Sequence, residues 1–241
     1  MSTIKAQQIV DRAGVILQDT TSVRWPESEL LDWLNDGQRE TVLLDPSAHA
    51  DNETVRLVSG SKQNFNDLAS DPDNSGTNIG AGIRLIDVVR NMGTGGSTPG
   101  RSVTVIERKI IDYQVPDWHS GQTAAEAMHF MHDERDPKTF YVYPPQPGTG
   151  TNYVELLYSS SPQDVTLSDS ISLDDVYANA LLDYVLYRAY SKDADFGSAQ
   201  LANAHYKAFS QSLGIKGNTD LFTIPGASMD TRERAQGGGG G

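Results

Sequence analysis

The chain has 241 residues, 37% of them hydrophobic, and its 32 acidic residues outnumber 19 basic ones to give a formal net charge of −13. A chain of this length can bury a substantial core, either as one domain or as a helical bundle with a smaller inserted domain. Its basic residues are scattered, which argues against a nucleic-acid-binding surface. With no cysteine, the sequence excludes disulfides and thiolate metal sites and is typical of a protein made in a reducing cytoplasm.

The sequence contains no candidate for a membrane anchor. No stretch approaches the roughly 20 consecutive apolar residues that span a bilayer. The N-terminal sequence MSTIKAQQIVDRAG lacks the apolar centre of a secretory signal peptide. We therefore expect a soluble protein that is not exported by a signal peptide and has no membrane partner.

Two helices are predicted near the N-terminus. The helical spacing of apolar residues indicates a first helix over residues 4–18. A second helix is expected to begin at Pro26, with acidic residues in its first turn, and to end at Pro46. Gly37 lies inside this helix, where glycine costs about 1 kcal/mol relative to alanine, so we expect another part of the backbone to approach there.

The middle of the chain, from about residue 53 to residue 166, changes to short β-rich segments. They are separated by Gly, Pro, Asn and Asp, which favour turns. Residues 108–119 could form a short helix before Pro116, and the pattern leaves this open. The expected strands are TVRLVSG, GIRLIDVVRNMG, RSVTVIE, AMHFMHD, TFYVYPP and YVELLYS.

The last third returns to helical periodicity. Ser172 and Asp175 have the spacing of a capping box at the start of a helix. A partner helix follows and is expected to end at Gly214. Tyr184 and Phe209 lie on the apolar faces of these two helices, and we predict that both are buried. The first of the two faces is formed by Val176, Ala180, Leu181, Tyr184, Val185 and Tyr187.

The turn between these two helices has the sequence SKDADFG, which raises the question of whether its acidic residues hold a ligand. Asp193 and Asp195 stand where a helix N-cap is expected. A capping role in a helical hairpin therefore explains them better than ligand binding.

These elements predict an α+β protein built as a four-helix bundle. The bundle would consist of an N-terminal helical hairpin (1–50) and a C-terminal helical hairpin (169–214). A small β-rich region (51–168) would be inserted between the hairpins, and an extended tail (215–241) would follow them. In the tail, Leu221, Phe222 and Ile224 are predicted to anchor a partner-binding segment that orders on assembly.

The best candidate for metal chemistry is the sequence HFMHDERDP, which contains His129, His132, Asp133 and Glu134. Imidazole and carboxylate groups both bind zinc or iron, so a metal-dependent hydrolase is the alternative function. However, residues three apart in a strand point to opposite faces of the sheet, which separates the two histidines. We therefore predict that these residues are structural.

Other motifs are incomplete. The loop DPDNSG (71–76) resembles the start of a calcium loop, but Gly82 stands where a bidentate glutamate is needed. The turn GTGG (93–96) lacks the lysine and helix of a phosphate-binding loop. No serine lies in a nucleophile elbow or has a plausible histidine partner in the sequence. The tyrosines of the last helices favour core and interface roles. We thus expect no catalytic residues, no metal and no cofactor.

Three segments, RWPESELLDWLNDGQRE, DERDPKTFYVYPPQP and LDDVYANALLDYVLYRAYSKDADF, occur in an order that resembles the head-to-tail adaptor (connector) proteins of tailed bacteriophages, especially short-tailed ones. The resemblance covers most of residues 20–213. It implies a structural virion protein at the head-to-tail junction, made in the host cytoplasm, with no enzymatic activity.

The resemblance also implies an assembly. Its partners would be the portal protein, tail or nozzle proteins and further copies of itself, usually in a ring of twelve. The ring would extend the DNA channel and provide a docking platform for the tail. DNA would pass without sequence-specific binding, which suits an acidic chain because a negative wall repels phosphate. Heterologous contacts in such a ring would use exposed Tyr, Trp and Met residues.

Overall fold

The computed structural model describes residues 2–148, 152–192 and 199–223, with side chains up to residue 214. The chain divides into two compact units. The helical unit contains Met1–Asp45 and Pro162–Gly241, and the β unit contains Pro46–Ser161. The β unit is therefore inserted into the sequence of the helical unit.

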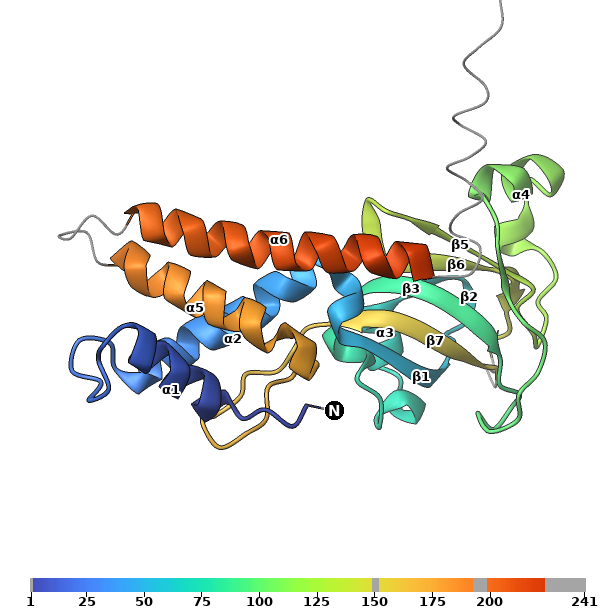
Figure 1. The fold of residues 1–241 in the computed structure, drawn as a ribbon. Coiled ribbons are helices and arrows are strands. Elements are labelled where there is room, and N and C mark those ends of the chain that lie inside the picture. The colour runs from blue at the N-terminus through green and yellow to red at the C-terminus, as the bar shows by residue number, and fades with distance from the viewer. Residues whose placement is uncertain (1, 149–151, 193–198, 224–241) are drawn as a thin grey trace, which may run out of the picture. The chain divides into compact units, whose positions relative to one another are not determined.

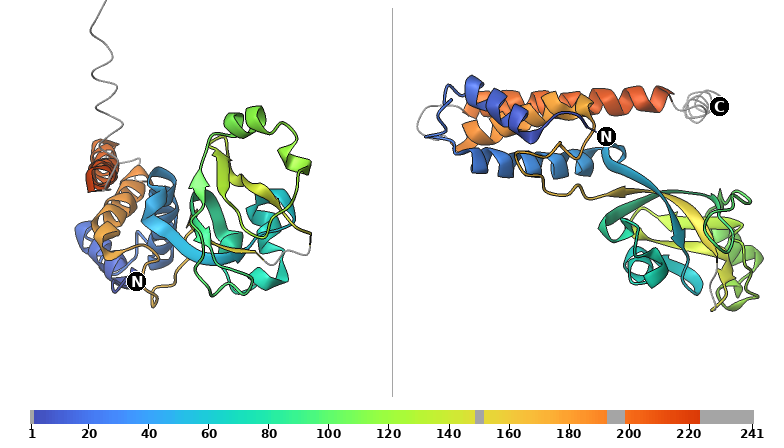
Figure 2. Two further views of the ribbon diagram at one scale, coloured as in Figure 1. Left: turned by 90° about the vertical axis from the view of Figure 1, so that its right-hand side faces the viewer. Right: turned by 90° about the horizontal axis from the view of Figure 1, so that it is seen from below.

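In the described residues of the helical unit there are four helices, of which α5 is the central one (Figures 1 and 2). α5 packs against α1, α2 and α6, because its buried residues, among them Leu181, Leu182 and Val185, lie on more than one face. It runs antiparallel to α2: Lys192 contacts Glu29 at one end, and Tyr177 contacts Asp45 at the other. The elements are α1 (Ala6–Ile16), α2 (Glu27–Leu44), the 3₁₀ turn η5 (Asp175–Tyr177), α5 (Ala178–Lys192) and α6 (Ala199–Thr223).

Aromatic rings fill the spaces between these helices. Tyr184 and Phe209 are 6% and 0% exposed, and their ring centroids are 5.2 Å apart, which confirms the prediction that both are buried. The Tyr184 ring also lies against Gly37 of α2. The element that approaches this glycine is thus an aromatic side chain and not the backbone that we expected.

The N-terminal segment is held by the region before α5. Lys5 forms an antiparallel bridge with Ser170, and the Asp175 carboxylate accepts hydrogen bonds from Ser2, Thr3 and the Ile4 backbone. The predicted capping box of Ser172 and Asp175 is therefore wrong. The cap of η5 is Asp174, which accepts from the backbone N–H of Val176.

The β unit contains two sheets. A three-stranded sheet has the order β1-β7-β3, and a four-stranded sheet has the order β2-β6-β5-β4. All neighbours are antiparallel except β4 and β5, which are parallel. The strands are β1 (Ala50–Arg56), β2 (Gly60–Asn64), β3 (Gly82–Asn91), β4 (Thr104–Val105), β5 (His129–Asp133), β6 (Asp136–Gln146) and β7 (Tyr153–Ser160).

Both sheets contribute to one main core. Val88 and Leu156 come from the first sheet, Phe130 and Phe140 from the second, and Phe65 from the short helix α3 (Phe65–Ala69). A smaller cluster of Ile111, Trp118 and Met131 is built partly by α4 (Arg108–Gln114) and η4 (Trp118–Ser120). The segment 108–119, left open from sequence, thus contains both of these short helical elements. The remaining 3₁₀ turns are η1 (Pro46–His49), η2 (Pro72–Asn74) and η3 (Ile79–Ala81).

The predicted four-helix bundle with a small β insertion is wrong. Over the described ranges the protein is α+β with six α-helices and seven strands in two sheets. The β part is a unit with its own two-sided core, which turn signals and strand patterns do not reveal because they specify segments and not pairing. The helices also differ from a regular bundle, since α5 is the shared partner of the other three.

The C-terminal helix is longer than predicted. α6 continues through Gly214 to Thr223, so residues 215–223 are helical and not part of an extended tail. Among the described residues, no heavy atom lies within 4 Å of the position that a Cβ on Gly214 would take, so no close contact requires a glycine there. In the described part of the chain, no helix has the length and apolar character needed to cross a membrane.

Candidate functional site

The predicted metal ligands lie on the hairpin formed by β5 and β6. In the register of this hairpin His129 is opposite Tyr143 and His132 is opposite Phe140. The two histidines therefore belong to opposite faces of the sheet, as their spacing predicts. His132 stacks on the Phe130 ring, with centroids 6.0 Å apart, whereas His129 stacks on Tyr143 and its Nδ1 lies 2.6 Å from the Thr104 hydroxyl.

The carboxylate of Asp133 is occupied by Arg135 in the turn that follows β5. Its Oδ1 accepts from the backbone N–H and the Nε of Arg135, both at 3.0 Å, and its Oδ2 accepts from Nη2 at 2.9 Å. These hydrogen bonds lower the pKa of Asp133 to about 2. Glu134 is exposed in the same turn. Within the described residues, no group of three or more His, Asp and Glu side chains could hold a metal ion.

A pocket next to this turn has mixed charge. Its cations are partly neutralised, because Arg135 binds Asp133 and Arg108 lies 3.5 Å from Asp112. The arrangement has neither a nucleophile next to a base nor an unpaired buried acid, which are the signatures of catalysis. Its lining residues are Glu107, Arg108, Lys109, Met131, His132, Asp133, Arg135 and Tyr141.

The acidic side chains of the loop that resembles a calcium loop (71–76) bind an arginine of the same chain. Asp71 and Asp73 both contact the guanidinium of Arg56, which supplies the positive charge that a metal would otherwise bring. The Asp71 side chain also caps η2 by accepting from the backbone N–H of Asp73. The loop is thus held by an internal ion pair. The glycine turn after β3 opens no helix, and Gly93 and Gly96 have φ values of +68° and +72° there.

The structure brings together one histidine, one serine and one aspartate whose proximity could not be predicted from their spacing along the chain. The hydroxyl of Ser160 donates to Asp51 Oδ2 at 2.6 Å and lies 2.8 Å from His49 Nδ1. The serine stands between the other two groups, whereas in a catalytic triad the histidine stands in the middle. Ser160 is 0% exposed, so its hydroxyl cannot meet a substrate. The pairing of β1 with β7 brings these residues together across the sheet.

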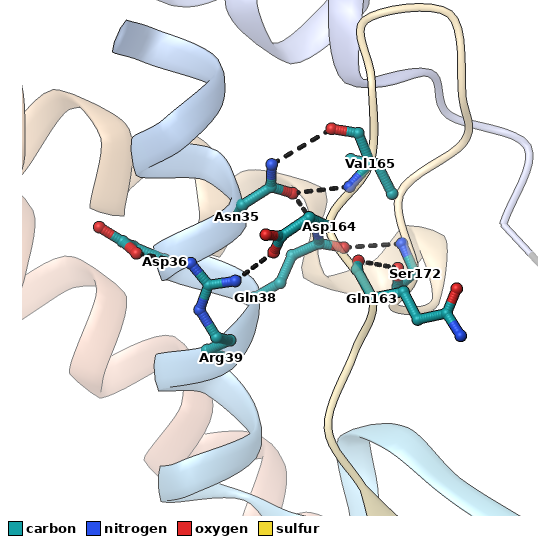
Figure 3. A network of polar contacts seen from close by, with 8 residues as sticks. All are labelled: Asn35, Asp36, Gln38, Arg39, Gln163, Asp164, Val165 and Ser172. Carbon is teal, nitrogen blue, oxygen red and sulfur yellow. Dashed lines mark hydrogen bonds and ion pairs between the residues drawn. The ribbon is translucent and has the colours of Figure 1, made fainter. Parts of the chain in front are cut away.

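A buried polar network fixes the segment that precedes α5 to helix α2 (Figure 3). The Asn35 side chain donates to the Val165 carbonyl at 3.2 Å and accepts from the Val165 N–H at 3.0 Å, as a neighbouring strand would. Gln38 accepts from the Ser172 N–H at 2.6 Å and donates to Asn35. Both amide side chains are buried.

An ion-pair group extends this network at the surface of α2. Arg39 contacts Asp36 on its own helix and Asp164 on the neighbouring segment, and these contacts raise its pKa. The spacing of Asp36 and Arg39, one helical turn apart, is visible in the sequence. The other partner of Arg39, Asp164, lies far along the chain and could not be predicted from it. The network is a structural support and holds no unsatisfied group that points to a ligand.

The residues predicted to bind a partner lie at the end of the described chain. Leu221 and Phe222 belong to the last turns of α6, and Ile224 lies outside the described residues, as do the predicted caps Asp193 and Asp195. The helical backbone at Leu221 and Phe222 does not agree with the extended tail that we expected there. Partner binding by these three residues stays a prediction.

Comparison with known proteins gives one family. The family model described as SU10 adaptor protein matches residues 4–233. This range includes all three segments that carry the resemblance to phage adaptors. A comparison with curated proteins gives no match.

Proposed function

Because the chain belongs to the SU10 adaptor protein family, a family of phage head-to-tail adaptors, we propose that it forms a ring beneath the portal of a short-tailed phage. The family confirms the resemblance seen in the sequence and makes this chain a structural component of a phage particle. The ring would extend the DNA channel and offer the tail or nozzle proteins a platform. The observation that carries the proposal is the match over residues 4–233.

The surface chemistry supports this function. The net charge of −13 would make a channel wall repel the DNA phosphates, so that DNA passes without being retained. A ring also requires exposed apolar side chains for its subunit contacts. The three tryptophans of the sequence are buried, so we infer that exposed aliphatic residues and tyrosines fill this role.

No observation favours the alternative function, a metal-dependent hydrolase. His129 and His132 are separated by the sheet, and Asp133 is bound by Arg135. A carboxylate that forms three hydrogen bonds to an arginine is a poor metal ligand, because the metal would have to displace the arginine first.

Electron microscopy of the purified chain mixed with the portal protein of the same phage tests the proposal. We expect a ring attached to one face of the portal, with twelve copies by native mass spectrometry. Particles lacking the chain should contain DNA-filled heads without attached tails. If the chain neither joins portals nor is found in tailed particles, the proposed function is wrong.

A further inference from the structure

The helical unit exposes two separate groups of aliphatic side chains. We name Val15, Ile16 and Val23 the loop patch; they are 64%, 46% and 82% exposed. We name Leu43, Leu44 and Val176 the helix-end patch; they are 72%, 50% and 65% exposed. Val176 was expected on the buried face of its helix, but it lies in η5 and is exposed. Single exposed aliphatic residues are ordinary, whereas two groups of three require an explanation.

The two patches lie at opposite ends of α2. Val15 and Ile16 of the loop patch end α1, Val23 lies in the loop just before α2, and Leu43 and Leu44 belong to the last turn of α2. Its 18 residues correspond to about 27 Å. Tyr177, next to Val176, hydrogen-bonds Asp45 at 2.9 Å and so brings η5 to the same end as Leu44. The ends of α2 are also clearly separated in Figure 2.

The loop patch is held rigidly. The carboxylate of Asp19 accepts hydrogen bonds from the backbone N–H groups of Val23, Arg24 and Trp25, at 3.1, 2.7 and 2.8 Å. Gln18 and Ser22 have φ values of +57° and +53°, a strained conformation that persists only where surrounding contacts impose it. A loop fixed in one shape loses little entropy when it binds.

The loop also carries a positive charge next to Val23. The guanidinium of Arg24 lies 4.7 Å from the centroid of the Trp25 ring, which is buried. Arg24 is exposed and directly follows Val23 in the sequence. The loop therefore presents an aliphatic group together with a cation.

The helix-end patch has the opposite charge. The C-terminal end of a helix is the negative end of its dipole, which basic residues commonly compensate. α2 has no basic residue in its last turn, and Glu40 adds negative charge there. Asp174, next to η5, is exposed. This end is thus aliphatic and acidic.

We propose that the two patches bind each other between neighbouring copies of this chain. Val23 and Arg24 of one copy would contact Leu43, Leu44 and Asp174 of the next. Two unlike and complementary surfaces on one protomer give a head-to-tail contact, which closes into a ring if the rotation permits. This proposal rests on the proposed ring and names the surfaces that form it.

Cysteine cross-linking tests the contact directly, because the chain contains no cysteine of its own. In rings on the portal or in assembled particles, the double variant Val23→Cys with Leu43→Cys should form disulfide-linked oligomers up to the full ring. Either single variant should form none, since residue 23 would face residue 43 and not its own copy. The matched control, Leu43→Cys with Tyr113→Cys, pairs the helix-end patch with an 87% exposed residue of the β unit and should also form none.

Charge reversal gives a second measurement. Arg24→Glu and Asp174→Arg should each lower the yield of rings at least tenfold in sedimentation, while circular dichroism stays unchanged. Combining the two substitutions should restore most of the yield. Lys109→Glu, an exposed change in the β unit, should have no effect.

Each outcome decides one of the two proposals. Rings that form without a cross-link between residues 23 and 43 would overturn this contact and leave the proposed function standing. Cross-links from both patches to the portal or a tail protein would likewise overturn it, since the occupant would be another protein. If no ring forms on portals or in particles, the proposed function fails, and this inference fails with it.

Discussion

The carboxylate of Asp175 binds Thr3 through both of its oxygens, although 172 residues separate the two in sequence. Oδ1 accepts from the backbone N–H of Thr3 at 2.9 Å, and Oδ2 accepts from its hydroxyl at 2.6 Å. The hydroxyl of Ser2 and the backbone N–H of Ile4 also donate to Oδ1. Asp175 thus attaches the beginning of the chain to the entry of α5. The hydrogen bonds from Ser2 and Thr3 hold its pKa well below its ordinary value.

This attachment predicts a dependence of stability on pH. The pKa of Asp175 is lower in the folded than in the unfolded protein, so its contribution is present above about pH 4 and is lost as the pH falls through the folded value. Asp175→Asn should therefore lower Tm at pH 7, and the difference between the two Tm curves should begin to shrink below about pH 4 and keep shrinking down to pH 2. Asp32→Asn, an exposed change on α2, should follow the wild type throughout. A difference in Tm that stays constant down to pH 2 would contradict the role of this carboxylate.

Gly37 and Gly14 should respond in opposite ways to alanine. A Cβ at Gly37 would lie 2.9 Å from Cδ1 of the buried Tyr184 ring, whereas at Gly14 the nearest heavy atom is the Asp19 carbonyl oxygen at 3.5 Å. Alanine gains about 1 kcal/mol over glycine inside a helix, but overpacking costs about 1–3 kcal/mol. We expect Gly14→Ala to raise the free energy of unfolding and Gly37→Ala to lower it by about 1 kcal/mol. Urea unfolding of both variants measures this; a stabilised Gly37→Ala variant would disprove the contact.

Phe209 should be the main anchor of α6. It is 0% exposed and contacts Tyr184. Phe209→Ala removes this buried ring and leaves a cavity, which should lower the free energy of unfolding by about 3–5 kcal/mol. Tyr206 lies on the same helix, is 38% exposed and contacts Tyr187, so Tyr206→Ala should cost only about 1–2 kcal/mol. Amide exchange along α6 should accelerate much more in the first variant. Equal effects would show that α6 is not held at Phe209.

The network of Figure 3 predicts a contrast between neighbouring residues of α2. Asn35→Ala would leave the N–H and C=O of Val165 without their partner in a partly buried site, which should cost about 1–3 kcal/mol. Arg39→Ala removes an exposed ion-pair group and should cost no more than about 1 kcal/mol. Thermal unfolding distinguishes the two, and a larger loss in the arginine variant would reverse this assignment.

The two strand histidines should be dispensable. Replacing both His129 and His132 with alanine should leave assembly and metal content unchanged, because they lie on opposite faces of the sheet and make only stacking and hydroxyl contacts. Counting tailed particles and measuring bound zinc and iron would check this. A tenfold loss of particles from a normally folded double variant would require a functional role for them.

Local patterns in the sequence predicted the helices over residues 4–18 and 26–45 within a few residues, because an amphipathic period and proline boundaries act over one or two turns. The same kind of signal located the strands except β2 (Gly60–Asn64), which it missed, and it correctly predicted that Tyr184 and Phe209 are buried. It also separated His129 from His132, since the alternation of side chains along a strand requires no knowledge of the partner strand. The family was found from three segments whose residues lie along most of the chain.

Only the tertiary structure decided how those segments pair and which side chains contact one another. The pairing of β1 with β7 joins residues about 100 positions apart, and it turns a supposed small insertion into a two-sheet unit with its own core. Asp175 resembles a helix cap in sequence, yet its carboxylate binds Thr3, because that N–H and hydroxyl reach it only in the folded chain. Gly214 resembles a helix end, yet α6 continues through it, because the local cost of one glycine is small against the rest of a 25-residue helix.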